Sequence, residues 1–132
     1  MKEPRAEAFR WLQQAENDLQ FAQLGLAKGF YAQVCFQCQQ IAEKALKSIH
    51  YGRLEKRIVF GHSLVELAGE LDLGPEMRDG LAILDQYYIP TRYPNGLPGG
   101  SPFEVYTRAQ AQSAVEFCAR VITLAQSQLP PE

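Results

Sequence analysis

Apolar residues recur at helical spacing through the middle of the chain, over Phe30–Tyr51. Steps of three and four residues, which line one side of an α-helix, separate the apolar positions Val34, Cys38, Ile41, Ala45 and Ile49. Further apolar residues flank this line, and a stripe this wide is typical of a helix packed against two or more neighbours. We therefore predict a central helix here, with the other helices packed around it.

The same spacing predicts a long helix on each side of the central one. The first begins near Pro4, because proline is favoured in a first helical turn, and it carries an apolar seam with alternating steps of three and four. The break at Lys28–Gly29 is so short that the first two helices should be antiparallel neighbours. The last helix opens at Thr107–Gln110, which has the form of a capping box, and ends before Pro130.

Two shorter helices and a long loop are predicted between these elements. Ser63–Glu66 has the form of a second capping box, in which the hydroxyl caps a backbone N–H and the glutamate reaches back. The fourth helix opens at Pro75 and ends before Pro90, which disfavours helical geometry in the preceding residue. Four prolines and three glycines over Ile89–Tyr106 then predict an irregular loop before the last helix.

Length and composition favour one helical domain. The chain has 132 residues, the usual size of one domain, so we predict a single domain over 1–132. Its 46% hydrophobic and 21% charged residues are typical of a folded globular protein. In fold class we predict an all-α, antiparallel up-and-down helical bundle of four main helices plus one short helix, with a long Pro/Gly-rich loop before the last helix.

Charge and hydropathy argue against several classes of protein. A formal net charge of −2 argues against a general nucleic-acid or membrane-surface binder but leaves room for a local basic patch. No apolar run approaches the roughly 20 residues of a membrane span, and the charged N-terminus lacks the apolar core of a signal peptide. We therefore expect a cytoplasmic protein with free thiols. Because Cys35-x-x-Cys38 lies inside a helix without a second ligand pair, we predict no metal site.

Several phrases, taken in order, resemble one family. They are QQIAEKALKSI (39–49), GHSLVEL (61–67) and DQYYIPTRYP (85–94), followed by a last helix that opens at Thr107. In this order and spacing they resemble the HEPN domain, a small all-helical family named for higher eukaryotes and prokaryotes nucleotide-binding. The resemblance covers nearly the whole chain and implies a helical bundle, commonly dimeric, that associates with nucleotide or RNA. In prokaryotes such proteins are often paired with a small nucleotidyltransferase, frequently as toxin and antitoxin.

The chain departs from the family's ribonuclease motif. RNA-cutting members carry an arginine and a histidine with four to six residues between them, and the positions at that spacing after Arg92 are Leu97, Pro98 and Gly99. No histidine follows His62. This absence argues against an enzyme, so we predict a nucleotide-binding module or nucleotidyltransferase partner with no catalytic residue and no cofactor. The alternatives are an RNA-cleaving toxin with a non-standard active site and a purely structural dimeric scaffold.

Arg92 and Tyr93, just past the fourth helix, are the first candidates for binding a nucleotide. A guanidinium holds a phosphate through two parallel hydrogen bonds, and a neighbouring tyrosine ring stacks on a base. The alternative is that Arg92 pairs with Asp85 or Glu43 and pins the loop to the bundle. Other aromatic residues around the loop likewise either stack on a base or anchor the loop to the core; they are Tyr87, Tyr88, Phe103 and Tyr106.

Three more side chains complete the predicted site. Lys44 and Lys47 lie nearly one turn apart on the central helix, and they either face an anionic group together or form a solvated face with a Glu43–Lys47 pair. His62 either touches a phosphate at the N-terminus of the third helix or bonds to backbone there. We expect Lys44, Lys47 and Arg92 to converge on one pocket.

The first helix also carries two large apolar residues off its main seam, Trp11 and Phe21. They indicate a second apolar face on this helix. We expect that face to be a homodimer surface.

Overall fold

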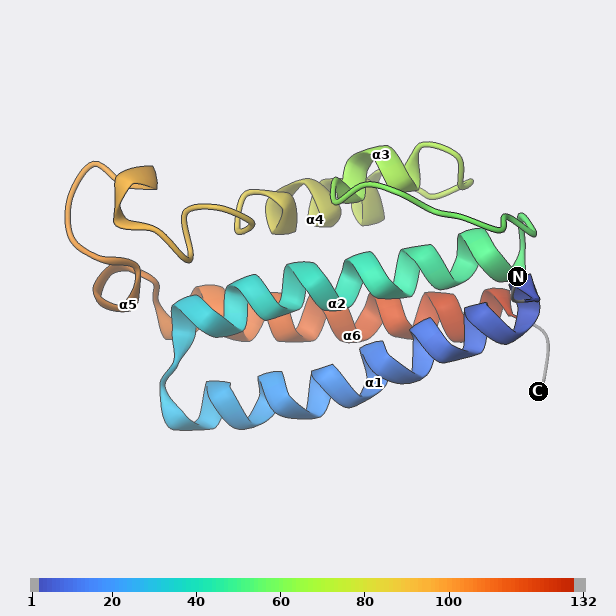
Figure 1. The fold of residues 1–132 in the computed structure, drawn as a ribbon. Helices are drawn as coiled ribbons and strands as arrows, with labels where there is room; N and C mark the ends of the chain where they lie inside the picture. The colour runs from blue at the N-terminus through green and yellow to red at the C-terminus, as the bar shows by residue number, and fades with distance from the viewer. Residues whose placement is uncertain (1–2, 130–132) are drawn as a thin grey trace.

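The computed structural model describes residues 3–129, and its helices are arranged around one of them, α2 (Figure 1). The elements in chain order are α1 (Pro4–Lys28), α2 (Tyr31–Gly52), α3 (Leu64–Ala68), α4 (Pro75–Asp85), the 3₁₀ turn η1 (Pro94–Gly96), α5 (Pro102–Val105) and α6 (Arg108–Gln128). Each of the other five α-helices contacts α2. The predicted all-α bundle is confirmed, and residues 1–2 and 130–132 of the predicted domain lie outside the described residues.

The long helices pack as predicted from their apolar stripes. α1 turns into α2 at Gly29, whose φ of 88° lies in the left-handed region that favours glycine. In Figure 1, α1 lies along one side of α2, the short helices α3 and α4 along another, and α6 behind it. None of the helices within residues 3–129 combines the length and the apolarity that a membrane crossing requires.

The apolar line of α2 forms the centre of the core. Cys38, Ile41 and Ile49 on this line are fully buried, as is Cys118 on α6. All three cysteines are free and buried. Burial raises the pKa of the Cys35 thiol to about 12, and a hydrogen bond to Cys118, together with burial, raises the pKa of Cys38. The thiols of Cys35 and Cys38 therefore stay protonated near neutral pH, and both residues behave as small core residues.

Two details between α4 and α6 differ from the sequence prediction. α4 ends at Asp85, four residues before the predicted end at Ile89, because backbone bonds to residues three positions back tighten its last turn. The loop predicted to be irregular contains the single-turn helix α5, whose capping box is closed by Ser101 and Glu104. Proline at the first position of α5 suits a helix start, so a proline-rich composition did not exclude this turn.

The start of α3 is capped mainly by a residue of another helix. Ser63 Oγ accepts the amide N–H of Glu66 at 3.2 Å, as predicted. In place of the expected reciprocal bond from Glu66, the Asp85 carboxylate accepts the amide N–H groups of Leu64 at 2.8 Å and Val65 at 3.1 Å. The capping box predicted at this helix is therefore only half formed, and Asp85 fastens α3 to the end of α4.

We predict that Asp85→Ala destabilises the protein. The substitution leaves the amide N–H groups of Leu64 and Val65 without their acceptor, so the free energy of unfolding should fall by about 1–3 kcal/mol. Urea unfolding followed by circular dichroism measures the change. Asp79→Ala, at an exposed position of the same helix, is the control and should change stability by less than about 0.5 kcal/mol. Equal losses in the two variants would contradict the capping role.

Candidate functional site

A buried carboxylate on α2, Glu43, lies at the centre of a small charged network. Its side chain is 7% exposed. Oε2 accepts a hydrogen bond from Nζ of Lys47 at 3.2 Å, and Oε1 lies 3.0 Å from Nδ1 of His62, in the segment before α3. Because a carboxylate only accepts, Nδ1 carries the proton of this bond. Nε2 of Gln40 is a third, longer donor to Oε1 at 3.5 Å, and the three donors together offset the cost of burying the charge of Glu43.

The His62 ring is held in place but remains accessible. It stacks on the ring of Tyr88 with a centroid distance of 5.3 Å and an interplanar angle of 20°. The His62 backbone carbonyl accepts a hydrogen bond from Nε2 of Gln39 at 2.8 Å. The side chain is nevertheless 61% exposed, so the imidazole remains accessible to solvent.

Arg92 stacks on aromatic rings rather than pairing with an acid. Its Cζ atom lies 4.4 Å from the ring centroid of Phe36, 4.8 Å from that of Tyr88 and 5.4 Å from that of Tyr93. Nε donates to the Tyr88 carbonyl at 2.9 Å. These contacts leave the two terminal nitrogens of an exposed guanidinium without a hydrogen-bond partner among residues 3–129.

The predicted pairing of Arg92 with an acid is therefore wrong. Asp85 caps α3, and Glu43 is engaged by Lys47 and His62. The imidazole of His62 and the guanidinium of Arg92 instead each contact the ring of Tyr88. Tyr93, the other residue predicted beside Arg92, contributes a third ring and is half exposed.

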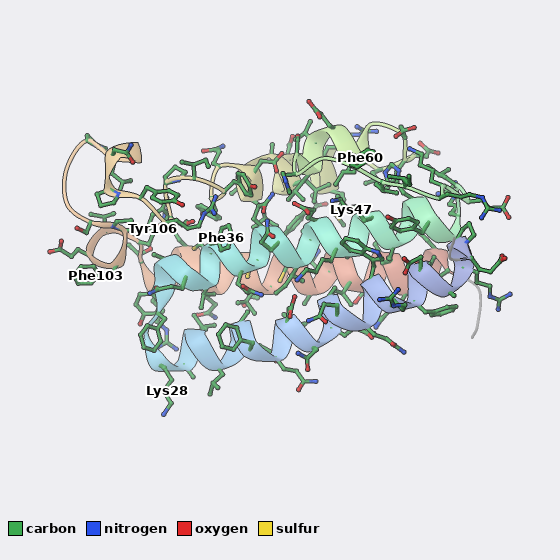
Figure 2. The ribbon with its side chains drawn as sticks, in the orientation of Figure 1. Lys28, Phe36, Lys47, Phe60, Phe103 and Tyr106 are labelled. Carbon is green, nitrogen blue, oxygen red and sulfur yellow. The ribbon has the colours of Figure 1, made fainter. Side chains whose placement is uncertain are left out.

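A hollow of about 600 Å³ opens beside Arg92, within the range of about 300–1,000 Å³ that is usual for small-ligand sites. Three of its lining residues are aromatic: Phe21, Phe36 and Phe103. Its polar lining includes Gln33, Gln37, Thr91 and Ser101. Figure 2 places Phe36 of α2 and Phe103 of α5 near the same end of the bundle. The hollow thus combines ring faces, side-chain amides and one uncompensated positive charge.

The two lysines of the predicted site are neutralised inside the bundle. Nζ of Lys44 forms an ion pair with the buried carboxylate of Asp18 on α1. Lys47 is 5% exposed, pairs with Glu43, and lies over the ring of Trp11 at 5.4 Å. The Glu43–Lys47 pair that belonged to the alternative is confirmed, but the solvated face is not, because Lys47 is buried and Lys44 is only partly exposed.

The expected convergence of Lys44, Lys47 and Arg92 on one pocket is wrong. Lys44 lines a different hollow, of about 650 Å³, which shares no lining residue with the hollow at Arg92. Figure 2 shows Lys47 well along α2 from Phe36, the residue on which Arg92 stacks. Of the predicted residues, His62, Arg92 and Tyr93 gather around Tyr88, and the two lysines do not join them.

The N-terminus of α3, which follows His62, is not available to bind a phosphate. The amide N–H groups of Leu64 and Val65 there already donate to Asp85. The alternative, in which the histidine side chain bonds to backbone at the helix start, is also wrong, because Nδ1 bonds to Glu43. Any contact between His62 and an anion must therefore come from its imidazole.

Sequence reasoning missed Phe36 and the role of Tyr88. Phe36 lies between two core cysteines in the sequence, so it was not identified as a site residue. It lies four residues before Gln40, however, and therefore on the polar side of α2. The predicted anchoring of the loop does occur at Tyr87 and Tyr106, whose rings meet edge to face at 5.8 Å. Burial raises the pKa of both tyrosines. Within residues 3–129, no group of histidine, cysteine or acidic side chains is placed to hold a metal ion.

Comparisons with known proteins place this arrangement in context. The family model of the HEPN domain matches residues 8–128. The chain is 36% identical to the protein TT1696 of Thermus thermophilus, with a TM-score of 0.86 over 92% of this chain and 98% of that one. It is 31% identical to ST0689, described as an archaeal HEPN homologue, with a TM-score of 0.78 over 98% and 100%.

A third solved structure, an HEPN domain protein of Thermotoga maritima, is 30% identical, with a TM-score of 0.71 over 89% of this chain and 95% of that one. No protein with a curated description matches. All three structural matches span most of both chains.

Proposed function

The chain belongs to the HEPN domain family, and on that premise we propose that it is a nucleotide-binding module whose phosphate contact is Arg92. The observation that carries the proposal is the exposed guanidinium of Arg92, which stacks on Phe36 and Tyr88 beside a hollow and has no carboxylate partner among the described residues. A positive charge that the protein itself does not neutralise is available to an anionic ligand.

The residues around Arg92 suit two different parts of a nucleotide, its phosphate and its base. The terminal nitrogens of the guanidinium match two oxygens of a phosphate. The rings of Phe36 and Phe103, which line the hollow, offer faces on which a base stacks, a contact worth about 1–3 kcal/mol per base. Stacking on Tyr88 also holds the guanidinium in place before the ligand arrives, which lowers the entropic cost of binding.

In this proposal the two lysines support the site from a distance. Asp18 and Glu43 neutralise them, so they add little positive potential at Arg92. Lys47 instead compensates Glu43, which orients His62. We therefore assign the phosphate to Arg92 and its neighbours and not to Lys44 or Lys47.

We predict that Arg92→Ala weakens nucleotide binding at least about tenfold, because a charge-assisted bond is worth about 1.5–3 kcal/mol. Isothermal titration calorimetry with AMP, ATP and GTP measures the affinity. Arg120→Ala is the matched control, since Arg120 is an exposed arginine that also lies over a ring, that of Phe117 at 5.4 Å, and its loss should leave binding unchanged. No heat from wild-type protein with any of these nucleotides would contradict the proposal and leave the partner and scaffold functions.

One observation favours a second candidate function, RNA cleavage. A histidine whose Nδ1 bonds to a carboxylate is the arrangement of a general base, and His62 contacts Tyr88, the ring on which Arg92 also stacks. The pair of Glu43 and His62 thus supplies a histidine, although no histidine follows Arg92 at the spacing of the ribonuclease motif.

Incubation of the purified protein with total RNA separates the two candidates. We expect the RNA to stay intact, as for a binding module. Cleavage by the wild type that disappears in both His62→Ala and Arg92→Ala would make the second candidate the function. Cleavage that survives both substitutions would point to a contaminating nuclease.

The proposal includes a homodimer formed through the end of the bundle where α1 meets α2. Phe21, Leu24 and Phe30 are each more than half exposed there and line an apolar hollow of about 330 Å³. A cluster of this kind is typical of a protein interaction site. Trp11, predicted to share the surface with Phe21, instead packs on Tyr51 of its own chain at 5.9 Å. The alternative occupant is the nucleotidyltransferase that the family resemblance implied, as the other half of a toxin–antitoxin pair.

We predict that light scattering of the purified protein at micromolar concentration gives twice the mass of the 14.8 kDa chain. Phe21→Ser should shift the mass to that of a monomer, because it places a hydroxyl in the apolar contact. Ile58→Ser, at a position 66% exposed in the segment after α2, is the control and should leave the dimer intact. A wild-type monomer would rule out the homodimer and leave the nucleotidyltransferase as the occupant of this surface.

A further inference from the structure

Two glutamines of α2 border the hollow beside Arg92. Gln33 and Gln37 lie four residues apart, on the same side of the helix, and both line the hollow that Arg92 lines. Gln39 and Gln40, on the same helix, use their amides in hydrogen bonds inside the fold. Gln33 and Gln37 form no such bond within residues 3–129. Two unused amides are therefore available to a ligand in this hollow.

The rest of the lining is mostly apolar. Phe21 on α1 is 63% exposed and Phe103 on α5 is 73% exposed, so both rings are open to a ligand. The hydroxyl of Thr91 already donates to the Tyr87 carbonyl. Among the described residues that line the hollow, none is acidic and Arg92 is the one basic residue. The base of a nucleotide in this hollow therefore meets ring faces and side-chain amides.

The chemistry of an amide discriminates among the bases. A glutamine side chain presents a carbonyl acceptor and an N–H donor side by side. Adenine presents the complementary pair on two edges, because its N6 amino group lies between the acceptors N7 and N1, and glutamine is a usual partner of its N6 and N7. An amide therefore matches adenine whichever of these edges faces α2.

The other bases match this lining less well. Guanine presents two acceptors, O6 and N7, on one edge, and the side chains that read this edge are arginine and lysine. Arg92 is assigned to the phosphate, so no cation of the hollow is left for guanine. The amino group of cytosine is usually read by a carboxylate, and the described lining has none. Cytosine and uracil, with one ring each, also cover less of a phenylalanine face.

We propose, on the basis of the function proposed above, that the hollow selects adenosine phosphates and that Gln33 and Gln37 are the residues that recognise the base. In this arrangement Arg92 binds the phosphate and Phe103 stacks on the adenine. A glutamine carbonyl accepts from the N6 amino group, and the NH₂ of the same amide donates to the adjacent ring nitrogen. Arg92 and the rings thus supply affinity for any nucleotide, and the amides supply the specificity.

The test is titration calorimetry with AMP, GMP, CMP and UMP and with two probes that lack parts of the base. Purine riboside 5′-monophosphate keeps the purine ring but lacks the N6 amino group, and ribose 5-phosphate has no base. We expect AMP to bind about tenfold more tightly than purine riboside monophosphate or the other three nucleotides, within the range that one bidentate pair supplies. Ribose 5-phosphate should bind most weakly, because it loses the stacking as well.

The double variant Gln33→Met with Gln37→Met tests the assignment of the two residues. Methionine keeps the length of the side chain and suits a helix, but it lacks the paired donor and acceptor. The variant should bind AMP no more tightly than purine riboside monophosphate. The ratio of these two affinities is the readout, because both glutamines also line the neighbouring apolar hollow and a change in fold or assembly would affect the two ligands alike. Gln20→Met, at an exposed position of α1 that lines neither hollow, is the control and should keep the preference for AMP.

The outcomes separate this inference from the function on which it rests. If GMP and purine riboside monophosphate bound as tightly as AMP, and Arg92→Ala weakened all three, the inference would be overturned and the nucleotide-binding function would stand. A preference for AMP that survives the double variant would also overturn it, because other groups would then recognise the base. If no nucleotide bound, or if binding ignored Arg92→Ala, both the inference and the proposed function would fail.

Discussion

The burial of one carboxylate, that of Glu43, is the constraint on which the candidate site depends. α2 is surrounded by all the other α-helices, so even its acidic side chain is 7% exposed. A buried charge is tolerated only with close partners. Lys47 contacts only one oxygen of the carboxylate, and the other receives only a long bond of 3.5 Å from Gln40 besides that of His62. The imidazole of His62 fills that place, which ties the segment before α3 to the central helix. The position of the exposed imidazole therefore follows from its hydrogen bond to Glu43, and not from the local conformational preferences of the segment before α3.

The same requirement at two other acids decides which cations remain available. Asp18 on α1 is buried and takes Lys44, and Asp85 takes the amide N–H groups at the start of α3. Once these carboxylates are engaged, neither is left for Arg92. The net charge of the chain gives no hint of this, because pairing is local. A weakly acidic protein thereby keeps an uncompensated guanidinium at one end of its bundle.

The sequence predicted the fold well and the site only in part, for a physical reason. Periodicity identified α1, α2 and α6, and the break at Gly29 predicted their hairpin, because both signals depend on neighbours within a few residues. The ion pair of Lys44 with Asp18 joins two helices, and the Asp85 cap joins α3 to α4. No pattern within one helix encodes such a contact. Phe36 was missed likewise, since its importance comes from an arginine in a distant segment.

Stacking on rings, in place of an ion pair, is what leaves Arg92 available to a ligand. An ion pair would neutralise the guanidinium and occupy its terminal nitrogens. The rings of Phe36 and Tyr88 instead stack on the flat face of the guanidinium, which neither neutralises its charge nor occupies its terminal nitrogens. The shared ring of Tyr88 then brings His62 close, although His62 precedes Arg92 in the chain, in the reverse of the order found in RNA-cutting members. A motif defined by spacing after the arginine cannot detect this histidine. The absence of that motif therefore says nothing about whether a histidine shares an aromatic neighbour with the arginine, and here His62, in the segment before α3, contacts the same Tyr88 ring as Arg92.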